Sequence, residues 1–160
     1  MGLSELSAFV HMLKEKGIID FNIDEFNHRL IAQKCVFLSE FFGWSHGYPY
    51  NLYIRGPYSK DLADDYYKLE NAEISEPIND LEPSFNSSGF INLVSGKDED
   101  WLESAATLMS IYCYNAKSMN DFKAAGFALS RTKEIKHKIS PDIISKAYKD
   151  LAKANLLPFN

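Results

Sequence analysis

Few side chains in this 160-residue chain are spaced in a way that suggests catalysis. His28 and Cys35 could share a helix face on which a histidine activates a thiol. Cys35 lies within a strongly apolar run, however, which is typical of a buried thiol. Asp61, Asp64 and Asp65 cluster on one predicted helix, where carboxylates more often serve the helix dipole and solubility than Mg²⁺ binding. The sequence therefore predicts a protein that is not an enzyme.

The familiar catalytic and cofactor motifs are missing from the sequence. It contains no Walker loop, no glycine-rich dinucleotide motif, no Gly-x-Ser-x-Gly and no deaminase signature. The four histidines and two cysteines are scattered and lack metal-ligand spacing. We therefore expect neither a cofactor nor a metal site.

Groups suited to binding another protein gather around one predicted bend. Gly56-Pro57 predicts a turn, and Ser59 can cap the helix that follows. Arg55 and Tyr58 flank the bend, and both residue types are favoured at interaction hot spots. The alternative is that these residues serve only the turn, the cap and packing. The predicted partner-binding residues are Arg55, Tyr58, Tyr50 and Tyr53.

The aromatic residues upstream of the bend allow two interpretations. Tyr48, Tyr50 and Tyr53, together with Trp44 and His46, could stack bases or grip a peptide. An alternation of tyrosines across a proline is also typical of a strand edge with one wet face.

Charge is distributed unevenly along the chain, although the formal net charge is only −5. Residues 111–160 contain nine Lys or Arg and four Asp or Glu, whereas residues 1–110 contain 8 and 18. An acidic body suits a basic partner protein, and a basic segment suits contact with nucleic acid. The alternative function is thus a transcriptional regulator, and the alternative for the lysines is a solvated helix face. The candidate nucleic-acid contacts are Lys133, Lys136, Lys138 and Lys146.

The sequence has no apolar run of membrane-spanning length, and residues 1–17 lack the pattern of a signal peptide. Two distant cysteines in apolar runs favour reduced thiols. We therefore expect a cytoplasmic protein without membrane contact. The high aromatic content for this size is compatible with a homodimer.

Periodicity and capping residues predict a predominantly helical α+β fold with two or three short strands. The N-terminal half is compatible with a winged-helix-like arrangement. We expect one domain over residues 1–160, made of a first half (1–72), a loop and strand (73–97) and a helical half (98–160). The expected helices are 3–16, a second from a cap at Asn22 or Asp24 to 42, 60–70, 98–115, 119–129 (with Ser118 in its capping box) and 141–154. The expected strands are 52–54 and 90–94, and 73–89 is an expected loop.

A wider set of residues resembles a known family pattern. The pattern comprises Gln33-Lys34, the apolar run to Leu38, Gly43, Tyr48 and Tyr50, Arg55-Gly56-Pro57-Tyr58-Ser59, Leu62 and Leu69. It resembles the YwgA-like family of small prokaryotic proteins, a relative of the Panacea domain, and weaker similarity extends over residues 28–157. The chain departs from the pattern at Ile31-Ala32, where the family usually has a leucine.

The resemblance implies a function but no active site, because the family has no agreed catalytic residues to carry over. Panacea-related proteins include antitoxins that neutralise diverse toxins. By resemblance we expect a non-enzymatic, antitoxin-like or defence-associated module that masks a partner protein, such as a toxin or a nucleic-acid-targeting protein.

Overall fold

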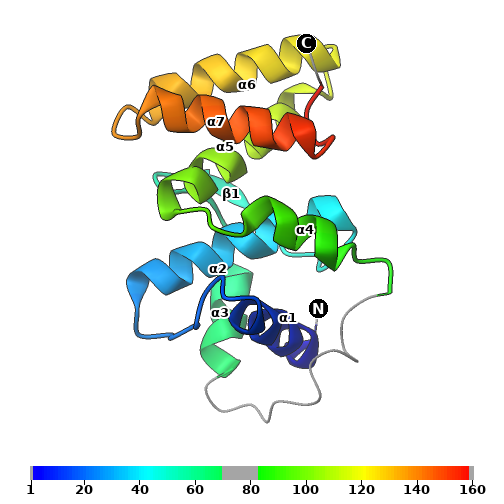
Figure 1. Cartoon of the computed structure of the whole chain (residues 1–160), viewed down its shortest axis with the longest axis vertical. Coiled ribbons are helices and arrows are strands. Elements are labelled where there is room, and N and C mark those ends of the chain that lie inside the picture. The colour runs from blue at the N-terminus through cyan, green and yellow to red at the C-terminus, as the bar shows by residue number, and fades with distance from the viewer. Residues whose placement is uncertain (1, 70–82, 159–160) are drawn as a thin grey trace. The chain divides into compact units, whose positions relative to one another are not determined.

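A computed structural model describes residues 2–69 and 83–158 of the chain (Figure 1). These residues form two compact units. The N-terminal unit holds the described residues of Met1–Asn51 and Tyr58–Gly96, and the C-terminal unit holds those of Leu52–Pro57 and Lys97–Asn160. A short segment between the halves of the N-terminal unit therefore belongs to the C-terminal unit.

The N-terminal unit is built from helices around an aromatic core. It contains α1 (Leu3–Glu15), α2 (Phe26–Ser39), the 3₁₀ turn η1 (Glu40–Phe42), α3 (Lys60–Lys68) and α4 (Ser87–Val94). α3 packs against both α1 and α2, and α4 packs against α2 and η1. The rings of Phe9 and Trp44 stack with their centroids 4.1 Å apart, and Phe85 and Phe90 surround them. Burial of these large rings contributes to the stability of this core.

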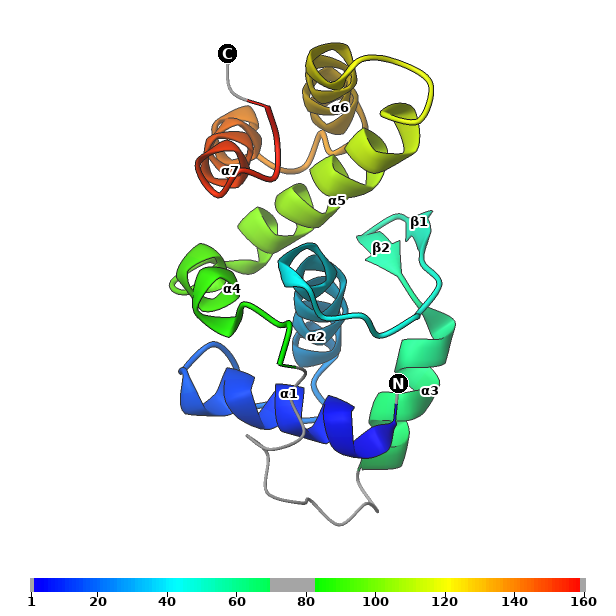
Figure 2. The same ribbon diagram turned by 90° about the vertical axis from the view of Figure 1, so that its right-hand side faces the viewer.

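The C-terminal unit is a three-helix arrangement that also holds residues Leu52–Pro57 of a hairpin. Its helices are α5 (Glu99–Asn115), α6 (Asp121–Ile135) and α7 (Pro141–Lys153), and α5 packs against both others (Figure 2). The interfaces are rich in fully buried alanines, and small side chains let helices approach closely. These alanines are Ala105, Ala106, Ala124, Ala125, Ala128 and Ala147.

A hairpin of two short strands, β1 (Asn51–Tyr53) and β2 (Gly56–Tyr58), forms the only sheet in the part of the chain that the structure describes. Its turn is Ile54-Arg55, so the prediction that Gly56-Pro57 makes the turn was wrong. Gly56 has a φ of 95° and begins β2 directly after the turn. A left-handed glycine after a two-residue turn is typical of hairpins with a bulge.

Several predicted helix starts are confirmed by their caps. Ser59 caps α3 by accepting a hydrogen bond from the Leu62 amide, and Ser140 caps α7, with Pro141 in the first turn. Asp98 caps α5 by accepting from the Trp101 amide at 2.8 Å. These signals lie within a few residues of the helix end, which is why sequence alone reveals them.

Residues 90–94 were predicted as a strand and form part of helix α4 instead. The prediction was wrong because a run of five mostly apolar residues is compatible with either structure. The buried side chains are Phe90, Leu93 and Val94, and this spacing of three and four residues is that of a helix face. Of the expected loop 73–89, residues 73–82 lie outside the described part, and Ser87–Gly89 belong to α4.

Two other helix starts differ from the prediction. α2 begins at Phe26, and the side chain of Asn22 instead accepts a hydrogen bond from the Asp24 amide in a local turn. α6 is capped by Asn120, whose side chain accepts from the Lys123 amide, and not by Ser118. In both cases several neighbouring residues could cap a helix, and the sequence does not decide between them.

The predicted fold class, a predominantly helical α+β fold, is confirmed: the described residues form seven α-helices and a two-stranded sheet. Over the described ranges, no helix combines the length and the apolar character needed to cross a bilayer.

Candidate functional site

The hairpin carries three consecutive exposed apolar side chains, among them Ile54, the most exposed large apolar residue in the described part of the chain. Ile54 at its turn is 91% exposed, Tyr53 58% and Leu52 44%. All three residues of β1 are exposed, whereas Gly56 and Pro57 of β2 are buried. Exposing large apolar side chains on an ordered turn gives no stability to the fold, and contiguous exposure of this kind marks interaction sites.

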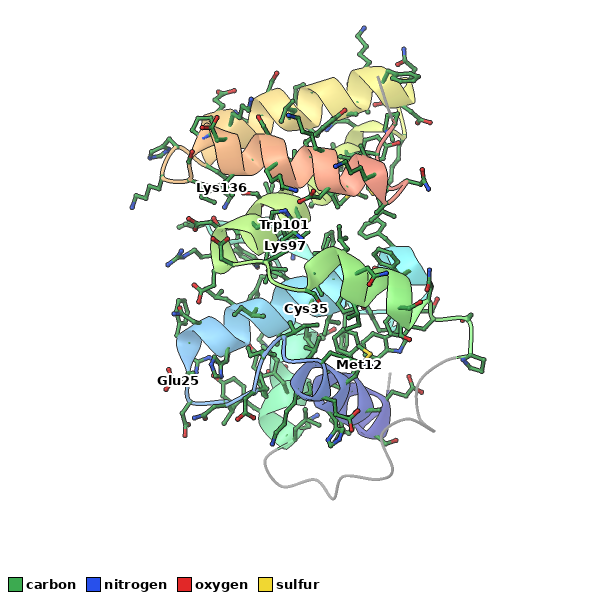
Figure 3. All side chains as sticks on the ribbon, viewed as in Figure 1. Met12, Glu25, Cys35, Lys97, Trp101 and Lys136 are labelled. Atoms are coloured by element: carbon green, nitrogen blue, oxygen red, sulfur yellow. The ribbon has the colours of Figure 1, made fainter. Side chains whose placement is uncertain are left out.

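A buried lysine holds the turn of the hairpin in place. Lys136, labelled in Figure 3, lies just after α6 and is only 6% exposed. It donates a hydrogen bond from Nζ to the main-chain oxygen of Ile54. Its Nζ also lies 3.5 Å from a carboxylate oxygen of Glu103 on α5. Burial lowers the pKa of Lys136, while Glu103 acts in the opposite direction. The lysine thus ties the hairpin turn to two helices of the same unit.

The side chain of Arg55, the second residue of the turn, forms one ion pair and is still largely exposed to solvent. Its guanidinium nitrogen Nη1 lies 3.8 Å from Glu103, and its side chain is 59% exposed. Glu103 therefore receives two cations, one from the hairpin and one from the end of α6. An ion pair this exposed contributes little to stability, which leaves the guanidinium available to a partner.

The four predicted partner-binding residues differ in how far their side chains are exposed to solvent. Tyr53 and Arg55 are exposed on the hairpin, as the prediction requires. The hydroxyl of Tyr50 is buried without a hydrogen-bond partner among the described residues, and its ring packs edge-on against Phe37 at 5.0 Å. Burial, followed by the charge of Glu40, raises the pKa of Tyr50. Tyr50 is therefore poorly placed to contact another molecule.

Tyr58 is half-buried at the end of β2 and belongs to the N-terminal unit. Its hydroxyl contributes, after burial, to raising the pKa of Tyr66 on α3. The alternative that Tyr58 packs within the fold is thus supported by its surroundings.

The four predicted nucleic-acid contacts are also divided. Lys136 is buried and engaged with Ile54 and Glu103, so it is not available to a phosphate. Lys146 is exposed but pairs with Asp150 one helical turn away. Lys138 is exposed and Lys133 is half-buried. A phosphate-binding strip through all four lysines is therefore not supported.

Three of the groups considered for catalysis, Cys35, Asp64 and Asp65, are buried or paired within the fold. Cys35 is fully buried, and burial raises the pKa of its thiol to about 12, so it is not a thiolate at neutral pH. Asp64 pairs with Lys60, and Asp65 accepts a hydrogen bond from the Tyr48 hydroxyl at 2.6 Å. Among the described residues, no group of three or more His, Cys, Asp or Glu could hold a metal ion.

A second surface feature is a pocket of about 380 Å³ in the N-terminal unit. It lies between α1 and the segment that joins α1 to α2, and Tyr66 and Leu69 also line it. Its charged lining residues Lys14 and Asp20 pair with each other at 3.5 Å. His11, which also lines the pocket, lies 3.2 Å from Glu15, so the described lining offers no cluster of unpaired charges that would identify a ligand.

Sequence reasoning singled out Tyr53 and Arg55, and it singled out Lys136 for a different role, but it missed Ile54 and Glu103. The strand prediction at 52–54 gave no indication that its side chains stay exposed. The available signal was Gly56, which was predicted to lie in the turn itself, whereas it lies directly after the turn with a left-handed φ. Comparisons of the chain with protein families, with curated proteins and with solved structures found no match.

Proposed function

We propose that the protein is a non-enzymatic binding module of the antitoxin or defence-associated type, acting in the cytoplasm by masking a partner protein. The observation that carries the proposal is the ordered, apolar turn of the hairpin. Ile54 lies in the turn and Tyr53 directly precedes it, and both side chains are exposed. The hydrogen bond from Lys136 to the Ile54 carbonyl holds the turn in place, so this apolar surface is ordered before a partner binds. A preorganised apolar anchor reduces the entropy cost of binding.

Charge adds to this support. The chain as a whole is acidic, with a formal net charge of −5, and most of the excess lies in residues 1–110. An acidic body attracts a basic partner over distance and raises the rate of encounter. A protein that acts on nucleic acid has such a basic surface, and covering that surface would block its activity.

The proposal is tested by affinity purification of the tagged chain from its native host, with and without nuclease treatment. The expected result is a stoichiometric protein that survives nuclease and is lost with Ile54→Asp. Tyr114→Asp is the matched control, because Tyr114 is 75% exposed in the same unit but lies on α5. Recovery of nucleic acid alone, weakening as salt rises, would reject masking in favour of a transcriptional regulator.

A further inference from the structure

The two strands of the hairpin differ in burial and in the main-chain hydrogen-bonding groups that their outer edges offer. Pro57 in β2 has no amide hydrogen, and both Gly56 and Pro57 are buried. β1 is exposed at every residue. Only β1 therefore offers a sheet edge from which a new strand could be added.

The alternation of an antiparallel pair determines which groups β1 offers. Residues whose main chain faces β2 alternate with residues whose main chain faces away. The turn of Ile54-Arg55 sets Tyr53 opposite Gly56 as the pair next to the turn. In an antiparallel hairpin the main-chain groups of that pair face the partner strand, so the amide and carbonyl of the neighbouring Leu52 face the outer side. Within the described ranges, Leu52 has no backbone hydrogen bond outside the sheet. A donor and an acceptor are thus unused at the middle of an exposed strand.

From this asymmetry, we propose that β1 is a docking edge on which an extended segment of another protein adds as a third strand, through the main chain of Leu52. This inference rests on the proposed masking function and specifies how the partner is held. Strand addition takes its affinity from main-chain hydrogen bonds and its specificity from alternate side chains. It also explains why the turn is fixed, because a free hairpin would have to be ordered first.

The side chains beside this edge define the chemistry of the added segment. Leu52 and Ile54 supply apolar contacts, so the segment carries apolar residues at alternate positions. Arg55 is an exposed cation, and Glu103, its carboxylate partner among the described residues, is shared with Lys136. The C-terminal unit carries eleven Lys or Arg and eight Asp or Glu in its described residues. An acidic residue at the end of the segment would therefore meet a favourable charge.

The probe for the test is a library of short linear peptides displayed on phage and selected on the full-length chain. A selected peptide is then measured against two variants at one position. Leu52→Ala shortens the side chain but keeps the amide hydrogen, whereas Leu52→Pro removes that hydrogen and blocks the edge. We expect Leu52→Pro to weaken binding by about tenfold or more and Leu52→Ala to weaken it clearly less. Circular dichroism and thermal unfolding check that both variants remain folded.

A second measurement keeps the test decisive even if Leu52→Pro fails to fold. Peptides N-methylated at alternate amides are titrated against the unchanged protein. A strand pairs along one edge only, so methylation of one alternate set should abolish binding and methylation of the other set should not. Equal binding by both sets, equal binding by both Leu52 variants, or selection of no peptide would overturn the proposal.

The outcomes separate this inference from the proposed function. If a partner protein from the native host is lost with Ile54→Asp but retained with Leu52→Pro, masking stands and strand addition is rejected. If the chain alone sediments as a dimer that Leu52→Pro dissociates, the edge is occupied by a second copy, and the proposal for a foreign segment is overturned.

Discussion

The side-chain amide of Gln33 holds the main chain of Ser59 through two reciprocal hydrogen bonds. Gln33 Nε2 donates to the Ser59 carbonyl at 2.8 Å, and the Ser59 amide donates to Gln33 Oε1 at 2.9 Å. Both residues are buried. The pair joins the middle of α2 to the cap of α3 within the N-terminal unit. It thereby fixes where the chain leaves β2 and begins a helix.

Replacing Gln33 by Met should destabilise the protein strongly. Methionine has a similar volume but leaves the buried amide and carbonyl of Ser59 without partners, and each such group costs about 1 to 3 kcal/mol. Ser59→Ala removes only the capping hydroxyl and should cost about 1 kcal/mol. Urea denaturation of both variants measures the difference. Equal stability of Gln33→Met and the unchanged chain would show that the amide pairing does not contribute.

The Gln33–Ser59 pair also illustrates what the sequence could and could not predict. The caps at Ser59 and Ser140 were predictable because a cap acts within three residues of itself. Gln33 and Ser59 are 26 positions apart, and Lys136 and Ile54 are 82 apart. Such pairings depend on the tertiary fold, which no local pattern encodes.

The candidate site shows the same limit. Residue type pointed to Arg55 and Tyr53, but it pointed equally to Tyr50, which the fold turns inward. It also grouped Lys136 with Lys138, although one is buried and the other exposed. Exposure separates these pairs, and exposure follows from packing between distant segments.

Lys136→Met should loosen the hairpin, whereas Lys138→Met should not. Loss of the Lys136 ammonium leaves Glu103, whose side chain is 14% exposed, without its nearer cation and frees the Ile54 carbonyl. Removing one partner of a buried ion pair costs about 3 to 5 kcal/mol, and partial exposure of Glu103 reduces that here. Chemical denaturation measures stability, and hydrogen exchange at residues 52–57 measures order in the hairpin. Similar exchange in the two variants would reject the anchoring role.

The two thiols should differ sharply in reactivity. Burial raises the pKa of Cys35 to about 12, so its thiolate is scarce at neutral or mildly alkaline pH. Cys113 is only partly buried. A colorimetric thiol reagent at mildly alkaline pH should label one cysteine in the folded protein and a second after unfolding. Cys113→Ser should remove the early reaction, and its persistence in that variant would show that Cys35 is accessible.

Asp150 should make stability depend on pH in the acid range. Burial acts to raise its pKa, but hydrogen bonds from Lys146 and from the Trp101 indole at 2.9 Å lower it below the ordinary value. The Nζ atom of Lys97 lies over the Trp101 ring, 5.2 Å from the ring centroid (Figure 3). Because the folded pKa is depressed, the stabilisation is complete above the ordinary carboxyl pKa and is lost as pH falls through the folded value.

The matching variant is Asp150→Asn, which should lower the melting temperature near neutral pH. As pH falls below about 4, near the ordinary aspartate pKa, the difference from the unchanged chain should shrink. Thermal unfolding at a series of pH values measures it. A difference that stays constant across the acid range would show that the charge of Asp150 does not contribute.

Gly43 should not tolerate alanine, although another glycine should. Gly43 has a φ of 95°, and a Cβ there would lie 2.5 Å from the main-chain oxygen of Ser84. The segment from Ser84 is held against η1, because the Asn86 amide donates to the Phe42 carbonyl at 2.8 Å. Gly43→Ala must therefore strain its own backbone and displace this segment, at a cost of about 1 to 3 kcal/mol or more.

Gly126 is the matched control for this substitution. It lies in α6, where a Cβ would meet nothing within 4 Å, so Gly126→Ala should stabilise the helix by about 0.5 to 1 kcal/mol. Urea denaturation should move the two midpoints in opposite directions. A midpoint for Gly43→Ala at or above that of the unchanged chain would mean that the close approach of Gly43 to Ser84 does not constrain this part of the fold.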